Sequence, residues 1–293
     1  MQHTQGTLAG YKALQLVYGE WLPEGEPKAV AVLVHGYGEH MGRYAHVISA
    51  LVQHDYAVYA VDHRGHGASA GLRAHVERFD HFVDDLHLLV QHAERAHPHL
   101  ARFMIGHSMG GLIATRYALR HQTDLAGLVL SGAALWIGDE VSPMLKRISS
   151  VLARVAPTLA LTAATRGEES VLSRDPLIQE QFNADPHTYK GKLRARMGYE
   201  MMNAAQDARA RMASLTLPLL IMHGADDRLT NPNGSRLLYE QAQSVDKALQ
   251  LWPGCRHEIF NEPEQCEVMD YMIEWLDLRV PRKVQTLAQE VLH

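Results

Sequence analysis

The sequence predicts an α/β fold with a doubly wound, mostly parallel sheet, and three observations indicate it. Continuous apolar runs such as Ala29–Val34 and Tyr56–Val61 are typical of strands that a parallel sheet buries on both faces. Segments with the apolar spacing of a helix, such as 77–97, separate these runs. A hydrophobic content of 46% and a charged content of 21% allow a packed core in one large domain, or in a domain with an insertion.

Strand and helix alternate in the first half of the chain, from about residue 28 to residue 132. Just before it, 14–21 alternates loosely and predicts an edge strand or a hairpin arm. The helix at 77–97 ends at Pro98, because proline cannot continue a helix. The other expected elements are a helix at 41–54, strands at 103–105 and 125–132, and a helix at 112–119. Strands that alternate with helices pair in parallel, so this half begins the sheet.

The alternation of strand and helix breaks after Gly132. Apolar residues of 144–155 fall on one helical face, Pro157 ends that helix, and no strand-like run appears before 217. We therefore expect a mostly helical insertion over 135–213, between core segments 1–134 and 214–293. An insertion at this point reaches the carboxyl edge of the sheet and predicts a cap there. The alternative is a set of additional core helices.

The sheet resumes with predicted strands at 217–222 and 248–252, which precede predicted helices at 233–242 and 268–278. Each of the two strands runs into a polar loop. The first loop carries Asp226 and Asp227, and the second carries His257. Functional groups of open α/β sheets gather at the carboxyl ends of strands, so these side chains are candidates for a site.

Composition excludes several classes of function. A net charge of −5 and the absence of a Lys/Arg-rich run argue against a nucleic-acid surface. The longest stretch without a charged residue, 125–138, is too short to span a bilayer. The N-terminus lacks the basic region and apolar core of a signal peptide, so we expect a cytoplasmic protein. Cys255 and Cys266 could pair but are typical of a reduced compartment, and no C-x-x-C or H-E-x-x-H spacing predicts a metal.

The motif G-H-S-M-G at 106–110 lies between the strand at 103–105 and the helix at 112–119. A strand, a G-x-S-x-G turn and a helix form a nucleophile elbow. Such a turn is tight and strained, so the positions beside the serine need glycine, which has no Cβ to clash. The following helix directs its first N–H groups at developing negative charge. Ser108 is therefore the candidate nucleophile.

A serine hydroxyl is a weak nucleophile at neutral pH and needs a base, which in turn needs an orienting partner. His257 is the candidate base, with Asp226 or Asp227 as its partner. The resulting order Ser, Asp, His is the order that α/β-hydrolases use. His223 and His107 are weaker candidates, since His223 precedes the glycine that ends its strand. His107 adjoins the serine, which directs its ring away from the hydroxyl.

Several motifs together resemble those of the monoacylglycerol lipase family of α/β-hydrolases. They are H-G-Y-G-E-H-M-G-R-Y at 35–44, D-H-R-G-H-G-A-S at 62–69, G-H-S-M-G-G at 106–111, and the loops of Asp227 and His257. S-R-D-P at 173–176 and H-E-I-F-N-E-P at 257–263 resemble bacterial members. The likeness extends over roughly 12–278, with the predicted cap its least specific part. It implies an α/β-hydrolase fold, and the family pattern G-x-x-D-R-L on 224–229 selects Asp227.

The resemblance implies a serine esterase that cleaves monoacylglycerols to fatty acid and glycerol through an acyl-enzyme, with no metal or organic cofactor. The backbone N–H groups of Met109 and Tyr37 would form the oxyanion hole. Glu39, Arg43 and His107 match positions near the alcohol-binding end. Glu39 and Arg43 could equally be an ion pair at i,i+4 on a helix.

Other activities of the same triad are hydrolysis of lysophospholipids or of short-chain esters. A peptidase is less favoured, because the H-G-G-P-G loop of proline iminopeptidases is absent. A non-catalytic binding module is a remote alternative, because such relatives commonly lose a triad member. The apolar residues of the predicted cap could line an acyl-chain tunnel or make transient contact with a membrane or micelle. The oligomeric state is left open.

Overall fold

The computed structural model describes residues 1–137, 143–162 and 170–281. Within them an eight-stranded sheet has the order β1-β2-β4-β3-β5-β6-β9-β10. Its strands are β1 Gln2–Ala9, β2 Gln15–Leu22, β3 Ala29–Val34, β4 Tyr56–Val61, β5 Arg102–His107, β6 Gly127–Ser131, β9 Leu219–Gly224 and β10 Lys247–Trp252. All pairings from β4 to β10 are parallel, and those of β2 with β1 and β4 are antiparallel. The predicted mostly parallel α/β sheet is confirmed.

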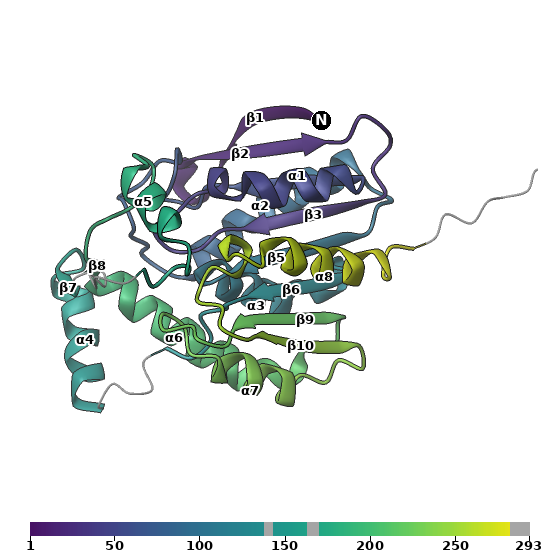
Figure 1. Cartoon of the computed structure of the whole chain (residues 1–293). Coiled ribbons are helices and arrows are strands. Elements are labelled where there is room, and N and C mark those ends of the chain that lie inside the picture. The colour runs from purple at the N-terminus through teal and green to yellow at the C-terminus, as the bar shows by residue number, and fades with distance from the viewer. Residues whose placement is uncertain (138–142, 163–169, 282–293) are drawn as a thin grey trace, which may run out of the picture.

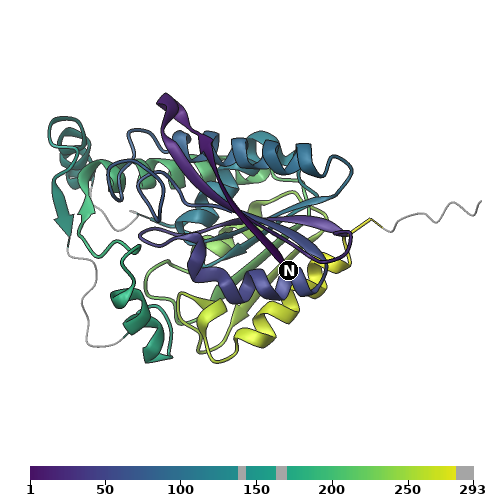
Figure 2. The same cartoon turned by 90° about the horizontal axis from the view of Figure 1, so that it is seen from above.

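Helices cover both faces of this sheet (Figure 2). The helices of the described residues are α1 Ala45–Gln53, α2 Asp80–Ala96, α3 Met109–His121, α4 Pro143–Val155, α5 Pro176–Ala184, α6 Ala195–Arg211, α7 Asn233–Gln241 and α8 Gln265–Asp277. Of these, α4 and α5 lie beyond the ends of the strands and not on a face of the sheet. Alternate side chains of a strand point to opposite faces. Val32 therefore joins the core under α2 and α3, and Leu33 joins the core under α1 and α8. This burial on both faces explains the continuous apolar runs of the central strands.

Of the two alternatives predicted for 14–21, the hairpin arm is confirmed, because β2 pairs antiparallel with β1, and the edge strand is wrong. Strand β1 was not expected, and it makes β2 an inner strand rather than an edge. All eight β1 residues pair along β2, with side chains such as Gln2, His3 and Thr4 exposed to solvent. A strand without a buried face has no apolar alternation, so the sequence pattern gives no signal for it.

The segment between β6 and β9 lies beyond the carboxyl ends of the parallel strands. In Figure 1 the arrowheads of β3 and β9 point toward α4, α5, β7 Ala160–Thr162 and β8 Leu193–Arg194. Strands β7 and β8 pair with each other, so the expectation of no strand before 217 is wrong. Both are too short, at three and two residues, to show a periodic pattern. The division into a core and a cap at 135 and 213 stays a prediction.

Helix α6 agrees in part with both interpretations of this segment, as a cap and as additional core helices. It packs on α3 and on α4. Ala204, Ala205 and Ala208 are buried in the core cluster, so one face of α6 belongs to the core. Its other neighbours, α4 and β8, lie over the carboxyl edge of the sheet. Small side chains allow α6 to approach α3 closely and fix the base of the inserted segment.

Two further observations concern compartment and membrane. None of the described helices is long and apolar enough to cross a bilayer. Cys255 is buried, Cys266 is exposed, and both are free thiols rather than a disulfide.

Candidate active site

Ser108 occupies a strained turn between the end of β5 and the start of α3. Its backbone has φ 54° and ψ −120°, a conformation that a residue with a Cβ rarely adopts. The side chain is only half-buried, whereas the residues on either side of it are buried. The turn thus raises the hydroxyl at the carboxyl edge of the sheet, as a nucleophile elbow does.

Glycines let the strand, the turn and the helix pack this closely. A Cβ on Gly106 would lie 2.7 Å from the Gly110 carbonyl oxygen, and one on Gly111 would lie 2.7 Å from the Ala133 Cβ. A Cβ on Gly110 would overlap the Val34 carbonyl oxygen at the end of β3. These glycines have no positive φ, so close approach rather than backbone freedom requires them.

His257 and Asp227 are directly bonded. The His257 Nδ1 lies 2.7 Å from the Asp227 Oδ2, and both side chains are buried. The other carboxylate oxygen accepts the amides of Leu229 at 2.7 Å and Thr230 at 2.9 Å. Asp226 is exposed, so of the two candidate carboxylates Asp227 is the one that contacts the histidine.

The pair has the electrostatics that a base and its partner require. Burial alone would raise the pKa of Asp227, but the attraction of His257 and hydrogen bonds from His223 and His257 outweigh it. The pKa of Asp227 therefore lies well below its usual range. Burial alone would lower the pKa of His257, but Asp227 raises it above 6.5. His257 is thus a stronger base than a free imidazole.

Two further groups, which the sequence did not single out as partners, hold Asp227 in place. The Thr230 hydroxyl and the His223 Nε2 lie 2.7 Å and 3.1 Å from the Asp227 Oδ2. The His223 Nδ1 lies 2.7 Å from the Ser235 hydroxyl. His223 is therefore a buried support of the carboxylate, which agrees with its weaker standing as a base.

Ser108 and His257 meet at Gly132, directly after β6. The Ser108 amide donates to the Ser131 carbonyl at 3.0 Å, and a Cβ on Gly132 would lie 3.4 Å from the His257 Nδ1. Among the described residues no hydrogen bond joins the Ser108 hydroxyl to His257. Catalytic hydrogen bonds are often long before substrate binds and shorten in the Michaelis complex. The structure therefore brings the three predicted residues to one edge of the sheet.

The two predicted oxyanion donors come from segments on either side of Ser108. Met109 is the first residue of α3, so its N–H has no partner inside the helix. Tyr37 follows Gly36, where a Cβ would lie 3.1 Å from the Ser108 Cβ. Within the described ranges the Tyr37 amide has no acceptor, whereas the Gly36 amide donates to Glu39.

Glu39 and Arg43 form the ion pair that their spacing allows, but not on one helix. Arg43 donates to Glu39 at 2.8 Å and makes two bonds to Glu258, at 2.7 and 2.8 Å. Glu39 precedes the short helix Met41–Tyr44, and its carboxylate accepts the Gly36 amide at 2.5 Å. The pair thus belongs to a buried network between the loops after β3 and β10. Glu258 is a member that the sequence analysis missed.

Burial and the charge of Arg43 shift the pKa values of the two carboxyl groups, Glu39 and Glu258, in different directions. Burial raises the pKa of Glu39, and the attraction of Arg43 offsets this only in part. Burial acts on Glu258 in the same direction, but Arg43 outweighs it, and the pKa of Glu258 is lowered. Glu258 is therefore the main counter-ion of Arg43.

His107 lies beside the base rather than beside the nucleophile. Its ring centroid is 4.7 Å from that of His257, and its Nδ1 is 3.2 Å from the Ser131 hydroxyl. Burial, and then the neighbouring His257, lower the pKa of His107 to about 3. A neutral ring at this place can contact substrate but cannot serve as the base at neutral pH.

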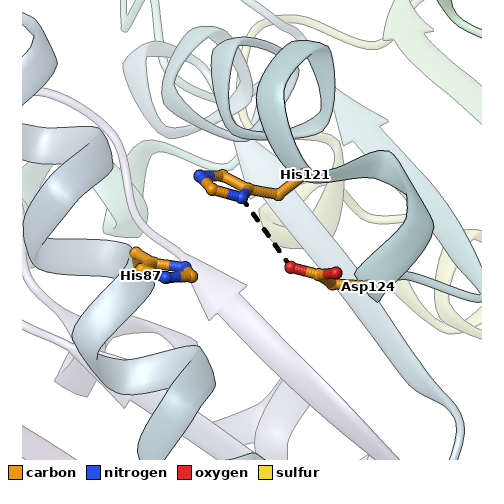
Figure 3. A group of neighbouring side chains, drawn as sticks. All are labelled: His87, His121 and Asp124. Carbon is orange, nitrogen blue, oxygen red and sulfur yellow. Dashed lines mark ion pairs between the residues drawn. The ribbon is translucent and has the colours of Figure 1, made fainter.

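A second group of candidate ligands, His87, His121 and Asp124, lies at the far end of α3 from Ser108 (Figure 3). The two histidine rings stack at 4.5 Å with an interplanar angle of 12°. An imidazole nitrogen binds a metal ion that lies in the plane of the ring. Two rings stacked nearly parallel at this separation cannot both have one ion close to their planes. We therefore assign no metal to this group.

Comparison with known proteins agrees with this geometry. A family model described as "Serine aminopeptidase, S33" matches residues 25–264. A monoacylglycerol lipase of Mycolicibacterium smegmatis is 41% identical over 273 residues, which cover 93% of this chain and 96% of that protein. A monoglyceride lipase of Rattus norvegicus is 35% identical over 263 residues, or 89% of this chain and 86% of that protein.

The chain belongs to the monoacylglycerol lipase family. A crystal structure of the Paleococcus ferrophilus monoacylglycerol lipase resembles this chain with a TM-score of 0.79 at 28% identity, and covers 95% of this chain and 100% of that one. Family membership confirms the α/β-hydrolase fold and makes the protein a carboxylic ester hydrolase. The likeness inferred from the motifs over roughly 12–278 is thereby confirmed over most of the chain.

Proposed function

We propose that this protein hydrolyses monoacylglycerols to a fatty acid and glycerol, with Ser108, His257 and Asp227 as its catalytic triad. One observation carries the proposal: a buried Asp227–His257 pair, 2.7 Å apart, lies at the sheet edge where a strained turn presents Ser108. Relatives of similar length that carry the name monoacylglycerol or monoglyceride lipase support this substrate class.

Acylation follows from the roles of these groups. His257 takes the proton of Ser108, whose oxygen attacks the ester carbonyl carbon, and Asp227 stabilises the resulting imidazolium. The amides of Met109 and Tyr37 receive the oxyanion, and each such donor contributes about 3 kcal/mol in the transition state. When the tetrahedral intermediate collapses, the C–O bond to glycerol breaks and His257 protonates the leaving oxygen.

Deacylation reverses the roles with water in place of glycerol. His257 takes a proton from water, the hydroxide oxygen attacks the acyl-serine carbonyl, and Ser108 leaves with the proton from His257. The fatty acid is released and the enzyme is restored. The scheme uses only side chains and backbone amides of this chain.

The alcohol-binding end is proposed to lie near Glu39, Arg43 and His107. Arg43 and Glu39 are engaged with one another and with Glu258, so their direct role is to shape this end rather than to offer free charges. His107 contributes a neutral ring beside His257. A lysophospholipid would bring a large charged head group to the same place, and this is the main alternative substrate.

We further propose a cytoplasmic protein that makes transient contact with membranes through α4. Two free thiols are typical of a reducing compartment. Val151 and Val155 of α4 are exposed by 57% and 74%, and Leu159 just beyond the helix is exposed by 45%. Exposed apolar side chains on the same side of the molecule as the carboxyl ends of the strands would bring the enzyme to the surface in which its substrate dissolves.

A fluorophosphonate probe tests the nucleophile directly. The wild type should react with one equivalent, and Ser108→Ala should not react. Asp227→Asn should lower kcat by about four orders of magnitude, because the amide no longer holds the productive imidazole tautomer. Its matched control, Asp226→Asn, removes an exposed carboxylate next to it and should retain activity within about twofold.

The substrate class is tested by comparing turnover of a monoacylglycerol, a diacylglycerol, a lysophospholipid and a short p-nitrophenyl ester. The highest kcat/KM is expected for the monoacylglycerol. A preference for the lysophospholipid would overturn the substrate assignment and leave the esterase mechanism intact. Absence of labelling in the wild type, or labelling that persists in Ser108→Ala, would refute the mechanism itself.

A further inference from the structure

The loop that carries His257 is bonded along its length to one segment of the insertion. We call residues 255–262 the histidine loop and residues 170–174 the strap. The Glu258 amide donates to the Leu172 carbonyl at 2.7 Å, and the Ser173 hydroxyl donates to the Asn261 carbonyl at 2.8 Å. The Arg256 side chain donates to carbonyl oxygens of the strap, at Ser170 and at Ser173. The two segments are about 85 positions apart in sequence.

Glu262 lies at the centre of this contact and joins both segments. Its side chain has no exposed surface. The Oε1 accepts the Arg256 amide at 2.5 Å. The Oε2 accepts the Arg174 amide at 3.0 Å and the Arg174 Nε at 3.1 Å, and it lies 3.3 Å from the Ser173 hydroxyl oxygen. A buried carboxylate is costly unless it is paired and hydrogen-bonded, and these donors satisfy Glu262 on both oxygens.

The consequence for His257 comes from the positions of these bonds. The amide before His257, that of Arg256, is held by Glu262. The amide after it, that of Glu258, is held by Leu172 of the strap. The peptide group that directly follows the base, 257–258, is therefore fixed by the strap, and the peptide group one residue before it, 255–256, is fixed by the carboxylate that binds the strap.

We propose that Glu262 is a positioning residue for His257, and that through it the strap is part of the catalytic apparatus and not only of the substrate pocket. This proposal rests on the proposed function, since it assigns His257 as the base. Movement of a catalytic group by about 1 Å can cost about 100-fold in rate. Loosening the histidine loop should thus lower turnover even for an ester too small to need a cap.

The test replaces Glu262 by glutamine and uses p-nitrophenyl acetate as the substrate. The amide of Glu262→Gln has one acceptor oxygen, so it can satisfy either the Arg256 amide or the strap donors, but not both. We expect kcat to fall about 10- to 100-fold with KM within about twofold, because the acetyl ester makes few contacts that the change could remove. The acid limb of kcat/KM should also move to lower pH, because a weaker contact between His257 and Asp227 raises the pKa of His257 less.

Glu264→Gln is the matched control. Glu264 binds the outer end of Arg174 at the surface and accepts a weak bond from the Cys255 thiol at 3.7 Å, but among the described residues it makes no hydrogen bond to the Arg256 amide that Glu262 holds. Loss of the Glu264 carboxylate should leave kcat within about twofold of wild type and the pH profile unchanged. Ser173→Ala is a milder second variant, because it removes the bond to the Asn261 carbonyl and the polar contact with Glu262 without changing a charge. It should lower kcat less than Glu262→Gln does, and it keeps the test decisive if that variant unfolds.

The outcomes separate this proposal from the proposed function. A wild type that hydrolyses the ester, together with Glu262→Gln and Ser173→Ala variants of unchanged kcat and pH profile, would overturn the positioning role whatever their melting temperatures. An equal loss of kcat in Glu264→Gln would also overturn it. A wild type that neither hydrolyses the ester nor reacts with fluorophosphonate would refute the proposed function instead.

Discussion

Ser108 has a backbone conformation that costs about 1–3 kcal/mol, and the surrounding turn maintains it. Ser108→Gly should relieve this strain, whereas Ser108→Ala should retain it because alanine also has a Cβ. Glycine also increases the entropy of the unfolded chain, and this lowers the free energy of unfolding by about 0.4–1 kcal/mol, which offsets part of the relieved strain. We expect Ser108→Gly to be about 1 kcal/mol more stable than Ser108→Ala in urea unfolding. Equal stability would show that the turn is not strained.

The raised pKa of His257 sets the pH dependence of activity. The protonated imidazole cannot accept the Ser108 proton, so activity is absent below this pKa and rises as the pH increases through it. Burial lowers the pKa of His257, but Asp227 more than compensates, and the acid limb of kcat/KM should lie above pH 6.5. Asp227 stays ionised throughout, since its own pKa is depressed. A profile of a p-nitrophenyl ester from about pH 5 to pH 9 measures the limb. A midpoint below 6.5 would contradict the assignment.

At this scale the sequence predicts residues whose motif is local and misses those whose role depends on distant partners. Ser108 is recognised from the strand, turn and helix around it. Glu258 and Glu262 lie within five positions of His257 in sequence, but their partners Arg43 and Arg174 are more than 80 positions away. No pattern in one chain reveals such pairings. The choice between Asp226 and Asp227 depended on a family pattern for the same reason.

At the scale of elements, the contact of α3 with β3 controls the geometry of the turn. Gly110→Ala would place a Cβ against backbone oxygens of Val34 and His35, which cannot move as a side chain could. We expect a loss of about 3 kcal/mol in urea unfolding, together with loss of activity. Gly25→Ala is the control, because a Cβ at Gly25 has nothing within 4 Å. It should change stability by less than about 0.5 kcal/mol. Similar losses in both variants would exclude close packing as the cause.

The central strands are the elements that the sequence predicts best. The bounds expected for β3 and β4 agree with the structure, because burial on both faces leaves an uninterrupted apolar run. The polar and exposed β1 and the short β7 and β8 lack any such pattern. Their pairing is determined by neighbouring strands rather than by their own residues. Helix ends differ by a few residues, as at α2, which begins at Asp80 rather than at 77.

At the scale of the whole molecule, the exposed apolar side chains of α4 predict membrane contact. The expected face of this helix also includes Leu145 and Ile148, whose side chains lie outside those that the structure describes. Replacing Val151 and Val155 together by glutamate should reduce flotation of the protein with liposomes of phosphatidylcholine and phosphatidylserine. The same substitutions should leave turnover of a soluble p-nitrophenyl ester within about twofold. Equal flotation of both proteins would count against membrane contact through α4.

The bonding of the strap to the histidine loop limits how the enzyme can be recombined. The segment between β6 and β9 can be exchanged for that of a relative, because it is inserted at a single point in the chain. Such an exchange would aim to change the preference for acyl chains. A graft that lacks counterparts of Leu172, Ser173 and Arg174 would leave the Glu262 Oε2 buried without its partners and the Glu258 amide without its acceptor. Chimaeras that import a foreign insertion while keeping residues 170–174 should remain active. Substrate range and catalytic competence can then be varied separately in the same segment.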